Sequence, residues 1–180
     1  MAWDGAVENE VAWLQGRHEL DCQAPSAQND WLRVFWGGVD GFSADRITQV
    51  DMPAPIGLET ADLNADGHLD LIGGSYADEV ESRHDTGTFI FWGNSKGFQS
   101  WNAQWLPGMT PIGYVVADFD TDGFLDVFAP HYHSELTREA LPCYLYWGSV
   151  KGFSRRRRTI LTANSAHDGL AADFDRDGRL

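Results

Sequence analysis

The chain has 180 residues, of which 43% are hydrophobic and 13% aromatic, so the composition predicts a packed fold and excludes wholesale disorder. Its formal net charge of −14 argues against nucleic acid as a partner, because phosphate binding needs a basic surface. No apolar run approaches the roughly eighteen residues of a membrane-spanning helix. The opening MAWDGAVENEVAWLQG lacks the basic and apolar regions of a signal peptide.

Two motifs recur along the chain with a step of 55 or 56 residues. The first is acidic and reads ADLNADGHLDL, ADFDTDGFLDV and ADFDRDGRL, with its leading aspartates at Asp62, Asp118 and Asp173. The second reads VFWGGVDGFS, IFWGNSKGFQ and LYWGSVKGFS, with its tryptophans at Trp36, Trp92 and Trp147. Two independent motifs that keep one period indicate tandem structural units.

This period divides the chain into consecutive units. We expect a single domain, residues 1–180, with units at about 1–54, 55–109, 110–165 and 166–180, the last being the start of a further unit. The first unit opens on Asp4, Gly5 and Glu8, which fit the tail of an acidic motif. Because both ends cut through the same motif, we expect a fragment of a longer protein, which alone would form an open arc prone to association.

Within residues 112–161 the sequence predicts four β-strands in chain order. The segments are IGYVVAD, LDVFAP, CYLYWG and FSRRRRTIL, separated by an acidic loop, a polar loop and a turn with glycine. Helical periodicity appears nowhere over a convincing length. The last segment, like SADRIT in the first unit, is far more polar than the others, which is typical of an outer edge strand.

The third strand of each unit predicts how the sheets pack. In TFIFWG, Ile90 and Trp92 face one side while Phe89 and Phe91 face the other. Since apolar residues occupy both faces, both must be covered, as when sheets stack face to face. We therefore expect an all-β fold of four-stranded antiparallel β-propeller blades. A β-sandwich is the alternative, but sandwiches do not repeat two motifs at a fixed step.

The acidic motif has the form D-x-[DN]-x-D-G-x-x-D, which places oxygen ligands at alternate positions around a sharp glycine turn. Such a set suits a hard cation, and Ca²⁺ is favoured because neither thiol nor imidazole serves as a ligand and Mg²⁺ keeps more of its own water. The expected ligands are Asp62, Asn64, Asp66, His68 (backbone) and Asp70 in one loop, Asp118, Asp120, Asp122, Phe124 (backbone) and Asp126 in the next, and Asp173, Asp175 and Asp177 in a truncated third.

These loops have two other interpretations, of which the sequence excludes one. An EF-hand loop needs a glutamate at position 12 and helices on both sides. Position 12 is Gly73 in one loop and Ala129 in the other, and strand patterns flank both, which excludes the EF-hand and its dockerin variant. The second interpretation, Asp/Gly-rich hairpin turns that bind no metal, stays open.

These motifs resemble the FG-GAP/VCBS repeats of integrin-α-like β-propellers. ADFDTDGFLDVFAP is similar to the calcium loop between the first two strands of a blade, and LYWGSVKGF is similar to the third strand and its turn. The resemblance covers nearly the whole chain and implies about three blades of a longer, seven-bladed propeller. It also implies Ca²⁺ at the ligands given above, an extracellular or periplasmic location, and a role in cell adhesion or beside carbohydrate-active domains.

Several side chains outside the metal loops are further candidates for a specific function. His131 and His133 could hold a transition metal, although loop histidines without a metal are the simpler interpretation. The basic run 155–158 suits a solvated outer strand or contact with an anionic polysaccharide. The loops 77–87 and 131–142 differ in sequence between units, as ligand-facing loops do.

Two further pairs of residues could have a specific role. Trp101 and Trp105 either pack against neighbouring side chains or form a platform on which a sugar stacks. Cys22 and Cys143 lie two units apart in unrelated contexts, so we expect neither a disulfide between them nor a zinc site.

The sequence contains no recognisable catalytic motif. G-x-S-x-G, H-E-x-x-H, the P-loop and the dinucleotide fingerprint are all absent. The metal loops account for the clustered carboxylates, which leaves no evident acid/base pair for glycoside hydrolysis. We therefore predict a non-enzymatic, calcium-binding module that binds a protein or glycan through its non-repeating loops and packs against the remaining blades. The alternative is part of a secreted propeller enzyme, such as a polysaccharide lyase or hydrolase.

Overall fold

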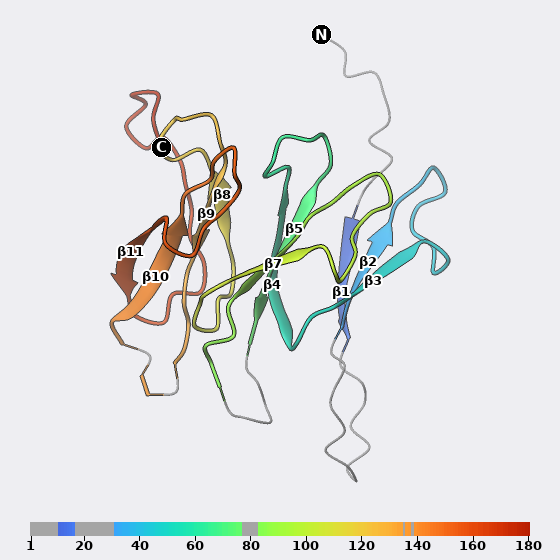
Figure 1. Cartoon of the computed structure of the whole chain (residues 1–180), viewed down its shortest axis with the longest axis horizontal. Helices are drawn as coiled ribbons and strands as arrows, with labels where there is room; N and C mark the ends of the chain where they lie inside the picture. The colour runs from blue at the N-terminus through green and yellow to red at the C-terminus, as the bar shows by residue number, and fades with distance from the viewer. Residues whose placement is uncertain (1–10, 17–30, 77–82, 135, 138) are drawn as a thin grey trace.

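The computed structural model describes residues 11–16, 31–76, 83–134, 136–137 and 139–180. The regular elements in these ranges are eleven β-strands, and Figure 1 shows them in three sheets that stand side by side. The predicted all-β class with antiparallel sheets is therefore confirmed. Within the same ranges, no helix is long and apolar enough to cross a membrane. The expected motif tail at Asp4, Gly5 and Glu8 lies outside the described residues, as does Cys22.

Each sheet is a meander in which strands adjacent in sequence are hydrogen-bonded neighbours. The first contains β1 (Val11–Gly16), β2 (Trp31–Trp36) and β3 (Ile47–Asp51). The second contains β4 (Pro55–Ala61), β5 (Asp70–Ser75), β6 (Thr88–Phe91) and β7 (Ala103–Leu106). The third contains β8 (Val115–Ala117), β9 (Asp126–Ala129), β10 (Leu141–Tyr146) and β11 (Arg158–Ala163).

The four strands expected within residues 112–161 correspond to β8–β11, but the outer two are shorter than the sequence suggested. β11 begins at Arg158 because Phe153 turns inward and stacks on Trp92 of the second sheet, with ring centroids 6.4 Å apart. β8 covers three residues and follows Gly113, whose φ of +79° is outside the β region. β11 lies at the edge of its sheet and four of its six residues are exposed, as expected of an outer strand.

The second sheet lies between the other two and is covered on both faces. On one face, Ile90 of β6 belongs to an apolar cluster that includes Val127 and Tyr146 of the third sheet. On the other face, the neighbouring Phe91 belongs to a cluster with Val34 of the first sheet. This arrangement agrees with the prediction drawn from the uniformly apolar third strand.

Adjacent sheets are joined by the aromatic residues of the second repeated motif. Trp36 of the first sheet stacks on Phe98 of the second, with ring centroids 5.6 Å apart and an interplanar angle of 19°. Trp92 and Phe153 make the same contact between the second and third sheets. Gly97 precedes Phe98 in a left-handed conformation (φ +80°), and a Cβ there would lie only 2.9 Å from Cζ2 of Trp36. The motif therefore encodes contacts between units as well as a turn within one.

A third feature of the chain also recurs with this step, and the structure shows its purpose. Gly57, Gly113 and Gly169 are each 56 residues apart, and the first two end the tripeptide Pro-Ile-Gly. A Cβ on Gly57 would overlap the backbone nitrogen of Gly113, and one on Gly113 would lie 2.6 Å from the carbonyl oxygen of His167. The first residues of neighbouring units thus approach through bare backbone, which only glycine permits.

Candidate metal centre

The three acidic loops lie at the same end of the sheets, at the top of Figure 1. They share one backbone conformation, because position 4 is left-handed in each, as is the glycine at position 6. The values of φ are +57°, +59° and +62° at Ala65, Thr121 and Arg176, and +88°, +91° and +90° at Gly67, Gly123 and Gly178. Non-glycine residues rarely adopt this conformation, so its recurrence indicates that the loops are held by specific contacts.

Side chains of the motif supply those contacts. In the loop 118–126, the two carboxylate oxygens of Asp118 accept hydrogen bonds from the backbone N–H groups of Asp122 (3.0 Å) and Gly123 (2.9 Å). Oδ1 of Asp122 in turn accepts from the N–H of Phe124 at 3.0 Å. Asp62 and Asp173 make the corresponding bonds in the other two loops. Position 1 therefore shapes the loop even without a cation.

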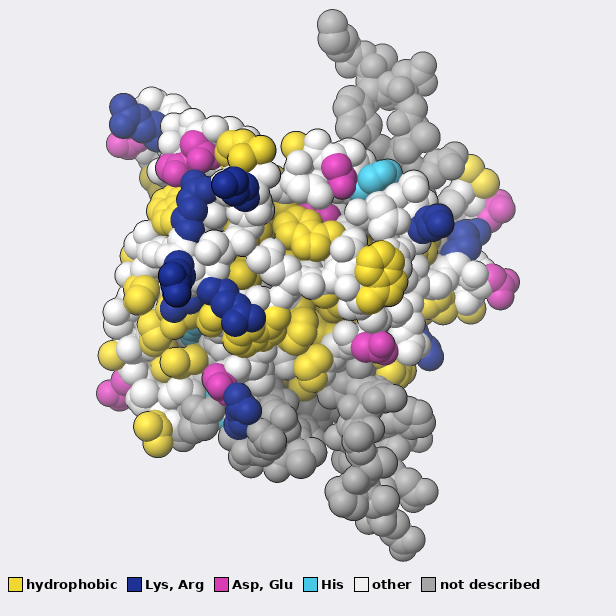
Figure 2. Space-filling view, in the orientation of Figure 1, with side chains coloured by type: hydrophobic (Ala, Val, Ile, Leu, Met, Phe, Trp, Pro, Cys, Tyr) yellow, Lys and Arg dark blue, Asp and Glu magenta, His cyan; other side chains and the backbone are white. Residues whose placement is uncertain are grey.

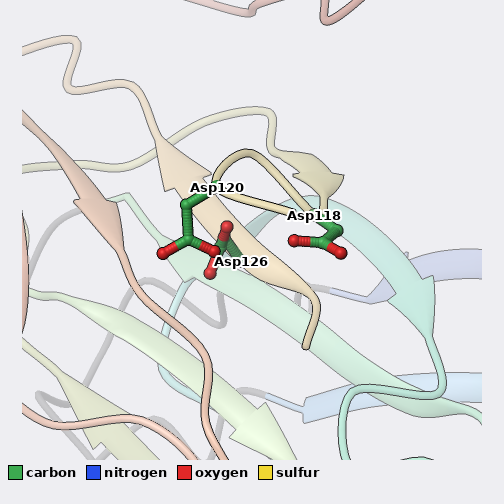
Figure 3. Close-up of side chains that lie close together, drawn as sticks. All are labelled: Asp118, Asp120 and Asp126. Atoms are coloured by element: carbon green, nitrogen blue, oxygen red, sulfur yellow. The ribbon is translucent and has the colours of Figure 1, made fainter. Parts of the chain in front are cut away.

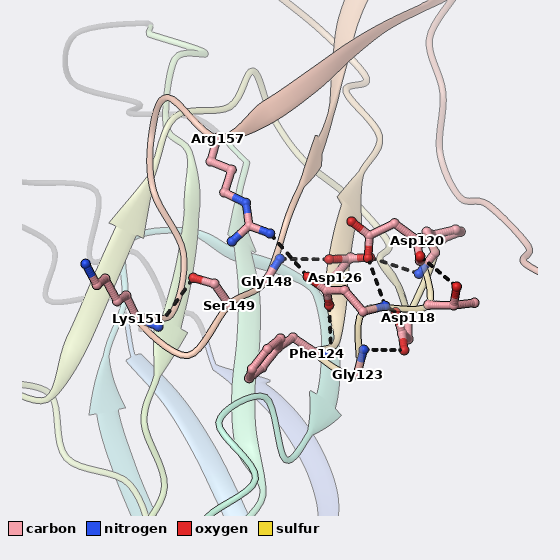
Figure 4. Close-up of polar contacts among 12 residues, drawn as sticks. Asp118, Asp120, Gly123, Phe124, Asp126, Gly148, Ser149, Lys151 and Arg157 are labelled. Carbon is pink, nitrogen blue, oxygen red and sulfur yellow. Dashed lines mark hydrogen bonds and ion pairs between the residues drawn. The ribbon is translucent and has the colours of Figure 1, made fainter.

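The aspartate at position 9 connects the two repeated motifs. The carboxylate of Asp126 is fully buried and accepts the N–H groups of Phe119 (2.9 Å) and Gly148 (2.7 Å), as Figure 4 shows for the second bond. Asp70 makes the same pair of bonds, at 2.9 Å to Leu63 and 2.8 Å to Gly93. The acidic loop is thereby tied to the Trp-Gly turn after the third strand, which explains why both motifs keep one period.

We expect Asp126→Asn to lower the free energy of unfolding of the metal-free protein by about 1–3 kcal/mol, because the amide turns an N–H₂ group towards a backbone donor. Chemical denaturation in the presence of a chelator measures this loss. Asp120→Asn is the matched control, since Asp120 is exposed and its bond to the Asp122 N–H is longer, at 3.3 Å. The control should change the same free energy by less than about 0.5 kcal/mol. Equal losses in the two variants would contradict the bridging role of Asp126.

Carboxylates converge in the second and third loops. Ligand atoms of Asp118, Asp120 and Asp126 all lie within 4.8 Å of one another (Figure 3). Asp173, Asp175 and Asp177 form a second such group, and these are the two groups found in the described part of the chain. Closely spaced carboxylate oxygens are the donor set that a hard cation such as Ca²⁺ takes. The residues present therefore fit the predicted ion.

The other predicted ligands are placed differently. Asp122 lies outside the close group, and its Oδ2 is 3.4 Å from Nη2 of Arg157. In the loop 62–70, the carboxylates form no close group of three, and the amide of Asn64 donates to Asp66 at 3.0 Å. His68 donates its backbone N–H to Asp66 at 2.9 Å. An arginine at one loop and an amide in the other thus make the two complete loops chemically unequal.

Burial acts against the charge of the position 9 aspartates. It raises the pKa of Asp70 to about 6, although the N–H groups of Gly93 and Leu63 oppose the shift. Burial also raises the pKa of Asp126 against two such bonds. A cation bound nearby would lower the pKa of such a carboxylate, because positive charge favours its ionised form.

The remaining candidates from the sequence have different surroundings in the structure. His131 is buried with its ring against Tyr144 (centroids 4.6 Å apart), whereas the ring of His133 packs on His84 at 4.2 Å. Trp101 is 82% exposed, while Trp105 is half-buried. Trp105 is thus packed within the fold but keeps part of its ring accessible, and the two histidines have different surroundings.

The basic run 155–158 makes specific contacts. Figure 2 shows several Lys and Arg side chains over the sheet of β8–β11. Arg155 lies over the ring of Trp105 at 4.9 Å, Arg157 pairs with Asp122, and Arg158 lies over Tyr144 at 4.1 Å.

Cys143 is a buried free thiol whose sulfur accepts the N–H of His131 at 3.3 Å.

Burial lowers the pKa of His131 from 6.5 to about 4. As the pH falls, the unfolded chain therefore takes up this proton first, and stability that is present above pH 6.5 is lost between pH 6.5 and 4. We expect His131→Gln to lose up to about 3 kcal/mol less free energy of unfolding over this interval than the parent protein. Urea denaturation across the interval measures the difference. The exposed His167→Gln variant is the control, and a slope like that of the parent in His131→Gln would contradict the prediction.

No protein-family model, no curated protein and no solved structure matches the chain.

Proposed function

We propose that this chain is a calcium-stabilised segment of a β-propeller that serves as a binding or scaffold module. The observation that carries the proposal is the convergence of Asp118, Asp120 and Asp126, from a loop whose spacing resembles the FG-GAP/VCBS calcium loop. The loops 62–70 and 118–126 each join the first two strands of a sheet, so an ion bound there would stabilise that hairpin directly.

The propeller arrangement is supported by contacts that recur from unit to unit. The Trp–Phe stacking and the backbone approach at Gly57 and Gly113 join neighbouring sheets at two separate places. We propose that these contacts continue into further blades of a longer protein. An extracellular or periplasmic location accompanies this proposal, because Ca²⁺ is plentiful there.

We propose binding in preference to catalysis because the repeated side chains make contacts that stabilise the fold. Asp70 and Asp126 bridge motifs, and Asp118 shapes its loop. A protein or glycan would then bind at the end of the sheets opposite the acidic loops, where the units differ in sequence. Adhesion is one use of such a module.

Calorimetric titration of the chelator-treated protein tests the proposal. We expect Ca²⁺ to bind and Mg²⁺ to bind at least about tenfold more weakly, because Mg²⁺ dehydrates reluctantly. Asp118→Ala should remove one of the calcium sites, while Asp85→Ala, an exposed aspartate outside the loops, should leave their number unchanged. A parent protein that binds no Ca²⁺ at millimolar concentration would refute the metal centre.

A further inference from the structure

A cavity of about 260 Å³ lies away from the acidic loops, between the end of β5 and the residues that lead into β6. It is lined by Pro53, Ser75, Arg83, Asp85, Thr86 and Trp105. The residues come from the connection between the first two sheets, the end of β5, the loop 83–87 and the edge strand β7. None of them belongs to the repeated motifs, and the loop that supplies three of them is one in which the units differ.

The apolar wall of the cavity is held in place by specific contacts. Nε1–H of Trp105 donates to the carbonyl of Thr86 at 2.8 Å, and the Thr86 hydroxyl donates to the carbonyl of Ser75. Gly87 has a φ of +78°, and any Cβ there would overlap the indole of Trp105. The guanidinium of Arg155 lies 4.9 Å from the ring centroid. These contacts therefore hold the indole in one position.

The carboxylate of Asp85 has capacity for further hydrogen bonds in the cavity. Arg83 donates two bonds of 2.8 Å to the two oxygens of Asp85, which leaves lone pairs on a carboxylate that is 55% exposed. The hydroxyl of Ser75 is buried and makes no hydrogen bond in the described part of the chain.

We propose that this cavity binds one neutral hexopyranose residue of a glycan, an inference that rests on the proposed function as a binding module. An indole beside an ion pair and hydroxyl groups matches the apolar C–H face and the polar edge of a sugar ring. The volume lies just below the roughly 300–1,000 Å³ of pockets for drug-sized ligands, which suits a single ring. A neutral sugar is favoured because Asp85 already balances Arg83, so an added carboxylate would meet like charge.

The test is titration of the calcium-saturated protein with methyl glucopyranoside, methyl galactopyranoside and methyl mannopyranoside, followed by saturation-transfer NMR and calorimetry. We expect at least one of these glycosides to bind with a millimolar Kd, and Trp105→Ala to weaken that binding by at least about tenfold. Asp85→Asn should weaken it by about three- to tenfold, because the exposed Asp85 carboxylate is the hydrogen-bond acceptor of the cavity that a ligand can reach. Glucuronate should bind more weakly than the neutral glycosides.

Trp101→Ala is the matched control, since this indole is exposed on the same sheet and does not line the cavity. It should leave the Kd unchanged. Trp105→Phe, which keeps an apolar ring, replaces Trp105→Ala in the test if the alanine variant fails to fold. Absence of binding to all three neutral glycosides, or full affinity in both Asp85→Asn and the Trp105 variant, would overturn the inference. Because Ca²⁺ binding is measured separately, such a result would leave the proposed metal centre standing.

Discussion

Removal of Ca²⁺ by a chelator is expected to lower the melting temperature of the protein by about 5–10 °C for each loop that loses an ion. The size follows from linkage, because an ion at a hundred times its Kd adds about 2.7 kcal/mol to the folded state. For a chain of this length, each kcal/mol shifts the melting temperature by about 2–4 °C. Differential scanning calorimetry of chelator-treated and calcium-saturated protein measures the shift.

Asp120→Asn separates the effect of the cation from that of the loop. This side chain belongs to the close carboxylate group but is exposed, so the variant should melt like the parent in chelator and gain less from Ca²⁺. Identical melting of the parent with and without Ca²⁺ would establish the alternative in which the loops are hairpin turns without metal.

Gly148→Ala is expected to lower the free energy of unfolding by about 3–5 kcal/mol, among the largest effects of a single substitution. Its Cβ would overlap the carbonyl oxygen of Leu125, and backbone cannot move aside there without breaking the 2.7 Å bond from the Gly148 N–H to Asp126. The substitution therefore breaks the link between the acidic loop and the turn. Urea denaturation in chelator isolates this loss from any change in metal binding.

Gly152→Ala is the matched control within the same turn. A Cβ on Gly152 has its nearest neighbour at 3.9 Å, on Trp92, so space is available and the cost is that of a left-handed φ of +72°. That cost is about 1–2 kcal/mol. If Gly152→Ala proved as damaging as Gly148→Ala, backbone conformation and not the close approach of Leu125 would explain the loss.

Much of the fold could be predicted because its determinants are local. Apolar strands, turn glycines and a fixed step place the units without knowledge of any contact between them. The start of β11 was missed because Phe153 lies in an extended, apolar-flanked segment, yet it is withdrawn from the sheet to stack on Trp92. That displacement is set by the neighbouring unit, and strand propensity carries no information about it.

The metal loop was predictable from spacing, but its unequal copies were not. A D-x-D-x-D pattern places Asp118, Asp120 and Asp122 alike, whereas the guanidinium of Arg157, 35 residues further along, pairs with one of them. The role of Asp126 as a link to Gly148 is equally non-local. The glycines at 57 and 113 did carry a signal, since their step of 56 residues is visible in the sequence.

The stacking of Trp36 on Phe98, and of Trp92 on Phe153, is a heterologous contact, because each unit offers a different surface to the unit before it and the unit after it. Identical units can therefore be added head to tail without inventing a new interface. Only the rotation from one unit to the next decides whether such an array closes into a ring or continues as an open helix. Gain or loss of a whole unit by gene duplication or deletion would leave every remaining contact intact, which a shorter insertion could not do.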